Sequence, residues 1–209
     1  MATGGGKRVG FVWTVTVVGV LVAIAAAVAL RPVLSAYIGW RREQRALRLV
    51  APGILVGEPS PVGEVPEWIP KWFRPGLARY YRRRAAVYVE CEDVTAEKLE
   101  VVSEFRDTRL LSLAHTDVRD ATISHVTELP RLEELTLLGT RIGDDGVRRL
   151  TCVDSLRALD LGGTRVTDAC VASLAAMRRL GRVCLDETRV TAAGVDELRR
   201  LRPDIEVTR

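Results

Sequence analysis

The feature that most constrains this chain is a repeat of 24 residues that runs from residue 84 to the end. Each block opens with two apolar residues separated by one position, and no insertion or deletion disturbs the register over five blocks. A unit this short cannot bury its apolar side chains alone, so successive blocks must stack. The repeat predicts a solenoid. The apolar pairs are Val87/Val89, Leu111/Leu113, Leu135/Leu137, Leu159/Leu161 and Val183/Leu185.

The spacing within one block predicts one strand and one helix. The residue between the two apolar positions points to the opposite face, which is the alternation of a short strand. Further apolar columns follow 12, 15 and 18 residues after the first position, which is a helical stripe. We therefore predict an α/β solenoid with short parallel strands on the concave face and helices on the convex face. Residues 202–207 read as a final strand that closes the stack.

A column of threonines is predicted to form a structural ladder where each strand turns toward its helix. A hydroxyl there can satisfy backbone groups of the turn that would otherwise be unpaired. The first block has Glu92 in this column and is interpreted as a degenerate capping repeat. The ladder consists of Thr116, Thr140, Thr164 and Thr188; helix N-caps are expected at Thr95, Thr167 and Thr191, and first-turn carboxylates at Asp144, Asp145 and Asp168.

Two segments carry a family resemblance. LEELTLLGTRIGDDGVRRL (132–150) and LRALDLGGTRVTDACVASL (156–174) resemble the leucine-rich repeat in its threonine-type bacterial form, which is similar to the cysteine-containing repeats of F-box-associated proteins. The resemblance covers residues 84–209. It implies a curved solenoid that recognises proteins, and it brings no catalytic motif. The order of the segments also resembles that of membrane-anchored bacterial proteins of this family, with an apolar segment first, a basic segment next and the repeats last.

Residues 9–30 contain no charged side chain. As a helix this run spans roughly 33 Å, enough for a hydrocarbon core of about 30 Å, so it predicts a transmembrane helix after a short tail (1–8). The alternative is a cleaved signal peptide, with Lys7 and Arg8 as its charged region. Signal-peptide apolar cores usually have about 7–15 residues, which favours an uncleaved anchor.

Three segments separate this anchor from the repeats. Residues 31–50 form a predicted basic juxtamembrane helix, where arginines, Tyr37 and Trp40 suit a lipid interface. Residues 51–66 read as a linker. The aromatic and basic residues 67–83 are interpreted as the N-terminal cap of the solenoid, with an amphipathic patch on lipid as the alternative. The arginines after the anchor outnumber the two basic residues before it, which slightly favours cytoplasmic repeats; an ordinary signal anchor would place the repeats outside.

Charge and motifs exclude several functions. Residues 84–209 carry 19 Lys and Arg against 23 Asp and Glu, so the net positive charge comes from residues 1–83, and nucleic acid is not an expected partner. We find no H-E-x-x-H, G-x-S-x-G or phosphate-loop motif, and expect neither catalysis nor a cofactor. Cys91 and His115 share a column of adjacent repeats, but too few further ligands are evident to predict a metal site.

The outward columns of the strands are the predicted binding surface, since concave solenoid faces are extended recognition surfaces. The expected function is a protein-binding module tethered to the inner or cell membrane. A structural protein of the envelope and a substrate-recruiting adaptor similar to F-box leucine-rich-repeat proteins are the alternatives. The candidate residues are Tyr88, Leu110, Ser112, Glu134, Thr136, Leu138, Asp160, Arg182, Cys184 and Asp186.

Overall fold

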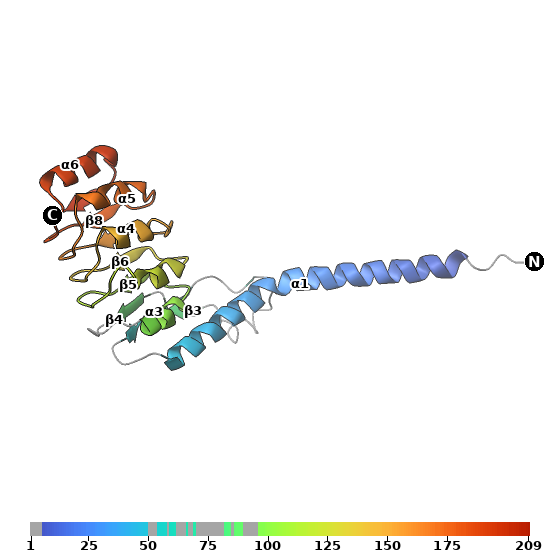
Figure 1. The fold of residues 1–209 in the computed structure, drawn as a ribbon. Helices are drawn as coiled ribbons and strands as arrows, with labels where there is room; N and C mark the ends of the chain where they lie inside the picture. The colour runs from blue at the N-terminus through green and yellow to red at the C-terminus, as the bar shows by residue number, and fades with distance from the viewer. Residues whose placement is uncertain are drawn as a thin grey trace, which may run out of the picture.

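The computed structural model describes residues 6–49, 54–57, 59–61, 66, 69, 82–84, 86–89 and 96–209. Side chains of the first helix are described only from Ala25 onward. Figure 1 shows a stack of strands and short helices, with one long helix that extends away from its first repeat.

A seven-stranded sheet runs along the stack and confirms the predicted α/β repeat fold with parallel strands. Six strands are parallel, and each position pairs with the residue 24 further on, as in Leu111 with Leu135. The parallel strands are β4 (Ala86–Val89), β5 (Leu110–Ser112), β6 (Glu134–Thr136), β7 (Ala158–Asp160), β8 (Arg182–Cys184) and β9 (Glu206–Thr208).

Short helices cover the other face of the sheet: α3 (Ala96–Ser103), η2 (Ile123–Glu128), α4 (Asp144–Leu150), η3 (Asp168–Cys170) with α5 (Val171–Ala176), and α6 (Ala192–Leu201). One repeat departs from the α-helix expected there, because η2 is a 3-10 helix. In this segment the hydroxyls of Thr122 and Thr127 donate to carbonyls three residues earlier. Such local bonds compete with the α-helical pattern.

The core is a single cluster that extends from Ala46 to Ile205. In each repeat the two apolar residues of the strand point into it, and Leu111, Leu113 and Leu137 are fully buried. Because every layer rests on the layers before and after it, burial of apolar surface supplies the stability of the stack.

Threonine side chains recur at one position of the turn after each strand from β5 to β8. The hydroxyls of Thr116, Thr140, Thr164 and Thr188 each donate to the carbonyl three residues earlier, at 2.6–2.7 Å. Thr167 and Thr191 are N-caps, because their hydroxyls accept from Ala169 N and Gly194 N. Glu92 and Thr95 lie outside the described residues.

Aspartates form a second ladder that links consecutive repeats. Asp144 accepts from the backbone N–H and the hydroxyl of Thr167, at 2.8 and 2.7 Å, and Asp168 accepts from the same groups of Thr191, at 2.7 and 2.8 Å. Asp120 accepts from the Gly143 N–H at 2.8 Å. The bonds from Thr191 lower the pKa of Asp168 below its usual range. We call Asp120, Asp144 and Asp168 the aspartate ladder.

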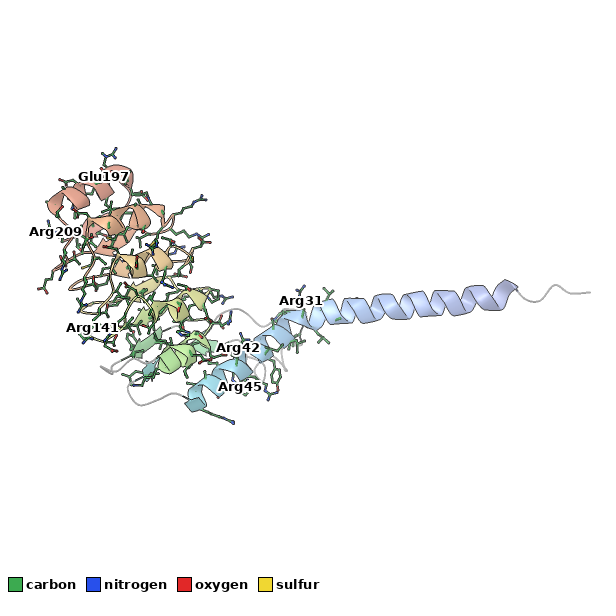
Figure 2. The ribbon with its side chains drawn as sticks, viewed as in Figure 1. Arg31, Arg42, Arg45, Arg141, Glu197 and Arg209 are labelled. Atoms are coloured by element: carbon green, nitrogen blue, oxygen red, sulfur yellow. The ribbon has the colours of Figure 1, made fainter. Side chains whose placement is uncertain are left out.

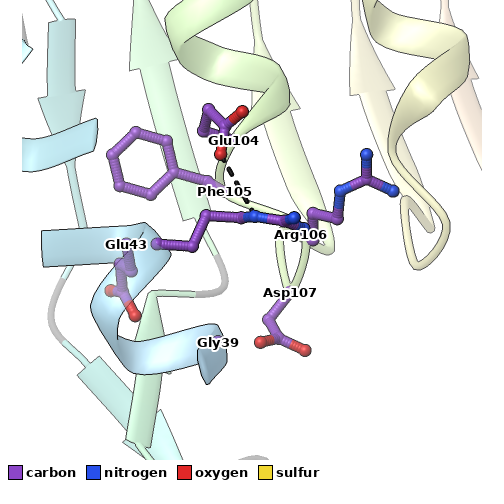
Figure 3. A pocket seen from close by; sticks show the side chains of 7 residues that line it. Gly39, Glu43, Glu104, Phe105, Arg106 and Asp107 are labelled. Atoms are coloured by element: carbon purple, nitrogen blue, oxygen red, sulfur yellow. Dashed lines mark ion pairs between the residues drawn. The ribbon is translucent and has the colours of Figure 1, made fainter. Parts of the chain in front are cut away.

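The long helix α1 (Gly6–Leu49) ends on the first repeat. Ala46 is 1% exposed in the core cluster, and Arg42 forms an ion pair with Glu104 at 3.3 Å. Figure 3 shows this pair beside a small pocket between α1 and the residues after α3. The last turns of α1 therefore cover the N-terminal end of the solenoid.

Two further strand pairs lie near this end. Strand β1 (Ile54–Val56) extends the main sheet by pairing antiparallel with β4, and β2 (Pro59–Pro61) pairs antiparallel with β3 (Arg82–Arg84). A sheet strand thus lies within the segment for which only a linker was predicted. Most of the predicted cap, residues 67–83, lies outside the described residues, although Ile69 is buried.

A membrane-spanning helix is not found among the described residues, where no helix is both long and apolar enough. Most of the predicted span, residues 9–24, belongs to the part of α1 whose side chains are not described.

Near the C-terminal end of the stack, two arginines donate hydrogen bonds to backbone carbonyls. The guanidinium of Arg202 donates to the carbonyls of Ala175, Met177 and Leu180 at 2.9–3.2 Å, and it also pairs with Asp204. Arg199 donates to the carbonyl of Val207 on the edge strand β9, at 3.2 Å. The bond from Arg199 satisfies one carbonyl of this edge strand, where unpaired backbone groups would otherwise be exposed.

One column of the turn after the strand has a left-handed backbone. It contains Gly139 and Gly163, with φ of 67° and 64°, but also His115 and Glu187, with φ of 56° and 55°. A side chain in this conformation costs about 1–2 kcal/mol, and glycine avoids the cost.

Replacing Glu187 with glycine is therefore expected to raise the free energy of unfolding by about 0.5–1 kcal/mol, after allowance for the greater freedom of glycine in the unfolded chain. Urea denaturation measures the change. Glu187→Ala removes the same charge but keeps the strain and should bring no gain. An equal gain in stability in both variants would show that the effect comes from loss of the charge and not from relief of backbone strain.

Candidate functional site

The candidate site is the face of the main sheet that the helices leave uncovered, here called the open face. Along β5 to β8, Leu111, Leu135, Leu159 and Val183 are buried, whereas the residues on either side of them are half-buried or exposed. Leu110, Glu134 and Arg182 lie in one outward column, and Ser112, Thr136, Asp160 and Cys184 lie in the next. The structure thus brings the predicted residues of these strands onto one face.

The first part of the open face is apolar. Tyr88 on β4 is 40% exposed and lies directly opposite Leu55 on β1, which is 51% exposed. Leu110 is the next large apolar residue, half-buried on β5. Leu55 was missed from the sequence because nothing in a three-residue strand outside the repeat predicted its pairing with β4. Exposed apolar residues gathered on one surface are typical of a contact with another molecule.

Leu138 borders this apolar part from the turn after β6. A Cβ added to Gly162 would lie 2.8 Å from Leu138 Cδ1, so the leucine side chain rests over the glycine of the following repeat. Any side chain at position 162 would displace it. Half-buried Leu138 therefore adds apolar surface in the middle of the open face.

The last part of the open face carries carboxylates around a thiol. Asp160 Oδ1 accepts from the Gly162 N–H at 2.9 Å, and Cys184 Sγ donates to Asp186 Oδ2 at 3.1 Å. Partial burial, the hydrogen bond to Asp186 and the charge of Asp160 raise the pKa of Cys184. The cysteine is therefore a thiol at neutral pH and a poor nucleophile. Glu134 adds a further exposed carboxylate, and Arg182 supplies one cation.

The structure bears on the metal site that was considered from the sequence at Cys91 and His115. Within the part of the chain that the structure describes, no group of three or more His, Cys, Asp and Glu side chains could hold a metal ion. Cys91, the other half of the pair with His115, lies outside that part. His115 instead packs on the next repeat, where a Cβ at Gly139 would lie 2.7 Å from His115 Nδ1. The open face itself carries apolar side chains at one end and mostly carboxylates at the other.

Comparisons with known proteins give only structural likenesses. No protein-family model matches the sequence, and no curated protein does. Similar solved structures include an internalin (inlF) of Listeria monocytogenes, with 16% identity and a TM-score of 0.42 over 53% of this chain and 30% of that one. Internalin C2 of the same organism has 19% identity and a TM-score of 0.42, over 56% and 45%. A leucine-rich-repeat protein of Leptospira interrogans has 21% identity and a TM-score of 0.39, over 53% and 33%. The chain spans less than half the length of each.

Proposed function

We propose that this chain is a membrane-tethered module that binds a protein partner on its open face, without catalysing a reaction. The observation that carries the proposal is the sheet surface left uncovered by the helices, on which Leu55 and Tyr88 are exposed and Leu138 is half-buried. Large apolar and aromatic side chains are the usual anchors of protein interfaces. Solenoids present such surfaces as their binding faces.

The charges of the open face describe the partner that would fit. Glu134, Asp160 and Asp186 outnumber Arg182 there, so a partner with an apolar group for the β1–β4 end and basic groups for the β7–β8 end is complementary. Complementary charge favours the correct orientation and speeds association.

The tether is supported by two features of the N-terminal part. Residues 9–30 carry no charge, and the same helix continues to Leu49, where it docks on the first repeat through Ala46 and Arg42. An anchor in residues 9–30 would then be joined to the solenoid by continuous helix. The basic residues after residue 30 suit anionic lipid and favour repeats on the cytoplasmic side.

Site-specific photo-crosslinking in cells tests the tether and the open face together. A photo-reactive residue is placed at Leu138 in the full-length chain, and a matched one at Arg149, which is exposed on α4 on the helix-covered side. We expect a defined protein adduct from position 138 alone, in the membrane fraction after a carbonate wash. Tyr88→Asp should abolish it, because a charge would be placed in the apolar part of the interface.

Three results would contradict the proposal. Adducts of equal yield from positions 138 and 149 would show that the open face is not special. An adduct that Tyr88→Asp leaves unchanged would remove the apolar part from the interface. Recovery of the full-length chain in the soluble fraction would overturn the tether.

A further inference from the structure

A second surface feature lies at the edge of the solenoid where the strands begin. It is a hollow of about 260 Å³ lined by residues of successive repeats: Arg109, Pro130, Arg131, Glu133, Ser155, Arg157 and Arg179. None of these residues belongs to the open face. Four of the seven are arginines and one is a carboxylate, although residues 84–209 as a whole have more acidic than basic side chains. The hollow therefore gathers positive charge on an otherwise slightly acidic domain.

The guanidinium groups of the hollow are incompletely paired. Glu133 lies between Arg109 and Arg157, and each Nε is 3.9 Å from one of its carboxylate oxygens, which is longer than a hydrogen bond. Arg131 is paired with Asp107 at 2.7 Å. Arg179 has neither an ion pair nor a side-chain hydrogen bond within the described ranges. Most of the N–H donors of Arg109, Arg157 and Arg179 are thus available to a ligand.

We propose that this hollow binds a phosphate-type oxyanion group. Guanidinium forks match the geometry of phosphate oxygens and can donate two parallel hydrogen bonds to them. A volume of about 260 Å³ is just below the ~300 Å³ where pockets for drug-sized ligands begin. It suits a phosphate group and the first atoms of the molecule that bears it. The carboxylate of Glu133 would turn away from the anion and would stay close to the guanidiniums of Arg109 and Arg157 on either side of it.

The direction of the edge favours the headgroup of an anionic phospholipid as the source of this phosphate. Arg141, in the turn after β6, lies at the edge of the solenoid turned away from the N-terminal half of α1 (Figure 2). Strands run toward that edge, so the edge where they begin faces the side to which α1 extends. This step rests on the proposed tether, because only a membrane around residues 9–30 brings headgroups to that side. A soluble phosphate ester is the other source.

Calorimetric titration of the purified full-length chain in a nonionic detergent tests the site. The probes are pyrophosphate, dihexanoyl phosphatidylglycerol and dihexanoyl phosphatidylcholine, whose ammonium group neutralises the phosphate. The variant Arg157→Gln/Arg179→Gln removes two guanidiniums from the hollow. The control Arg148→Gln/Arg149→Gln removes the same charge from α4 on another surface. We expect the hollow variant to bind phosphatidylglycerol roughly tenfold or more weakly, and the control to bind as the native chain does.

Each outcome bears on the proposal. The site and the lipid source are supported if two results hold. The hollow variant loses affinity for phosphatidylglycerol, and the native chain and both variants bind phosphatidylcholine more weakly than the native chain binds phosphatidylglycerol. Affinity for pyrophosphate alone, lost in the same variant, supports the oxyanion site but overturns the lipid source. Equal affinity of the hollow and control variants for every probe overturns the site. Because the probes are soluble, none of these results depends on membrane insertion or on the open face.

Discussion

Replacing Leu137 with alanine is expected to lower the free energy of unfolding by about 2–5 kcal/mol. Leu137 is completely buried in the central repeat, and the residues one repeat before and after it, Leu113 and Leu161, are buried to the same degree. The substitution removes apolar contacts on both sides of the layer and leaves a cavity that the stacked strands cannot close freely. In a solenoid each repeat contacts only its neighbours, so a central layer contributes to two interfaces at once.

Leu138 provides a matched control because it is the next residue and the same amino acid. It lies half-buried on the open face, over Gly162, so Leu138→Ala should cost less than about 1 kcal/mol. Urea denaturation of the full-length chain, followed by far-ultraviolet circular dichroism, measures both variants. Losses of similar size would mean that Leu138 is as important to folding as the core column. The photo-crosslinking result at position 138 would then have to be repeated at Tyr88.

The repeat could be predicted in such detail because residues that are 24 positions apart in the sequence are also neighbours in the folded structure. A period of 24 residues places Leu111, Leu135 and Leu159 in register on adjacent strands, and the pairing of these strands follows that period. The outward residues between them, including Ser112 and Asp160, were assigned to the open face by alternation alone. The threonine ladder could be proposed from the sequence for the same reason, since one turn conformation recurs at a constant position in each repeat.

What the sequence did not predict lies outside the period or depends on side-chain reach. Strand β1 has no counterpart in the repeats, so neither its pairing with β4 nor the exposure of Leu55 could be inferred. Arg202 was one arginine among several near the C-terminus, and only the folded chain brings four carbonyls of the preceding repeat within its reach. The hollow at Arg157 and Arg179 is lined by two columns of the repeat, in which arginines alternate with a glutamate or a serine. The sequence therefore did not indicate that the arginines lie close together.

The aspartate ladder illustrates the same distinction. Asp144 and Asp168 were predicted as first-turn carboxylates, which favour a helix N-terminus through its dipole. They do occupy first turns, but each also binds a threonine 23 residues further on. Bonds to the ionised form lower the pKa of Asp168. Its contribution to stability is therefore present above the pKa of the unfolded chain, about 3.9, and is lost as the pH falls through the lower folded value.

Asp144→Ala is expected to lower the free energy of unfolding by about 2–3 kcal/mol, because it removes two hydrogen bonds to a charged acceptor and leaves the Thr167 N–H and hydroxyl without that partner. Asp145→Ala is the matched control. Asp145 is the next residue in the same first turn, but it is exposed and forms a surface ion pair with Arg148, so its loss should cost no more than about 0.5 kcal/mol.

Asp144→Asn separates charge from hydrogen bonding. Its amide oxygen can still accept from the Thr167 N–H, and its amide nitrogen can donate to the hydroxyl, so we expect a loss between those of the two alanine variants. Equilibrium urea denaturation at pH 7 compares all three. If Asp144→Ala and Asp145→Ala lose equally little, the carboxylate acts only on its own helix, as the sequence alone suggested. A large difference would establish the aspartate ladder as a link between repeats, one that stabilises each turn through the repeat before it.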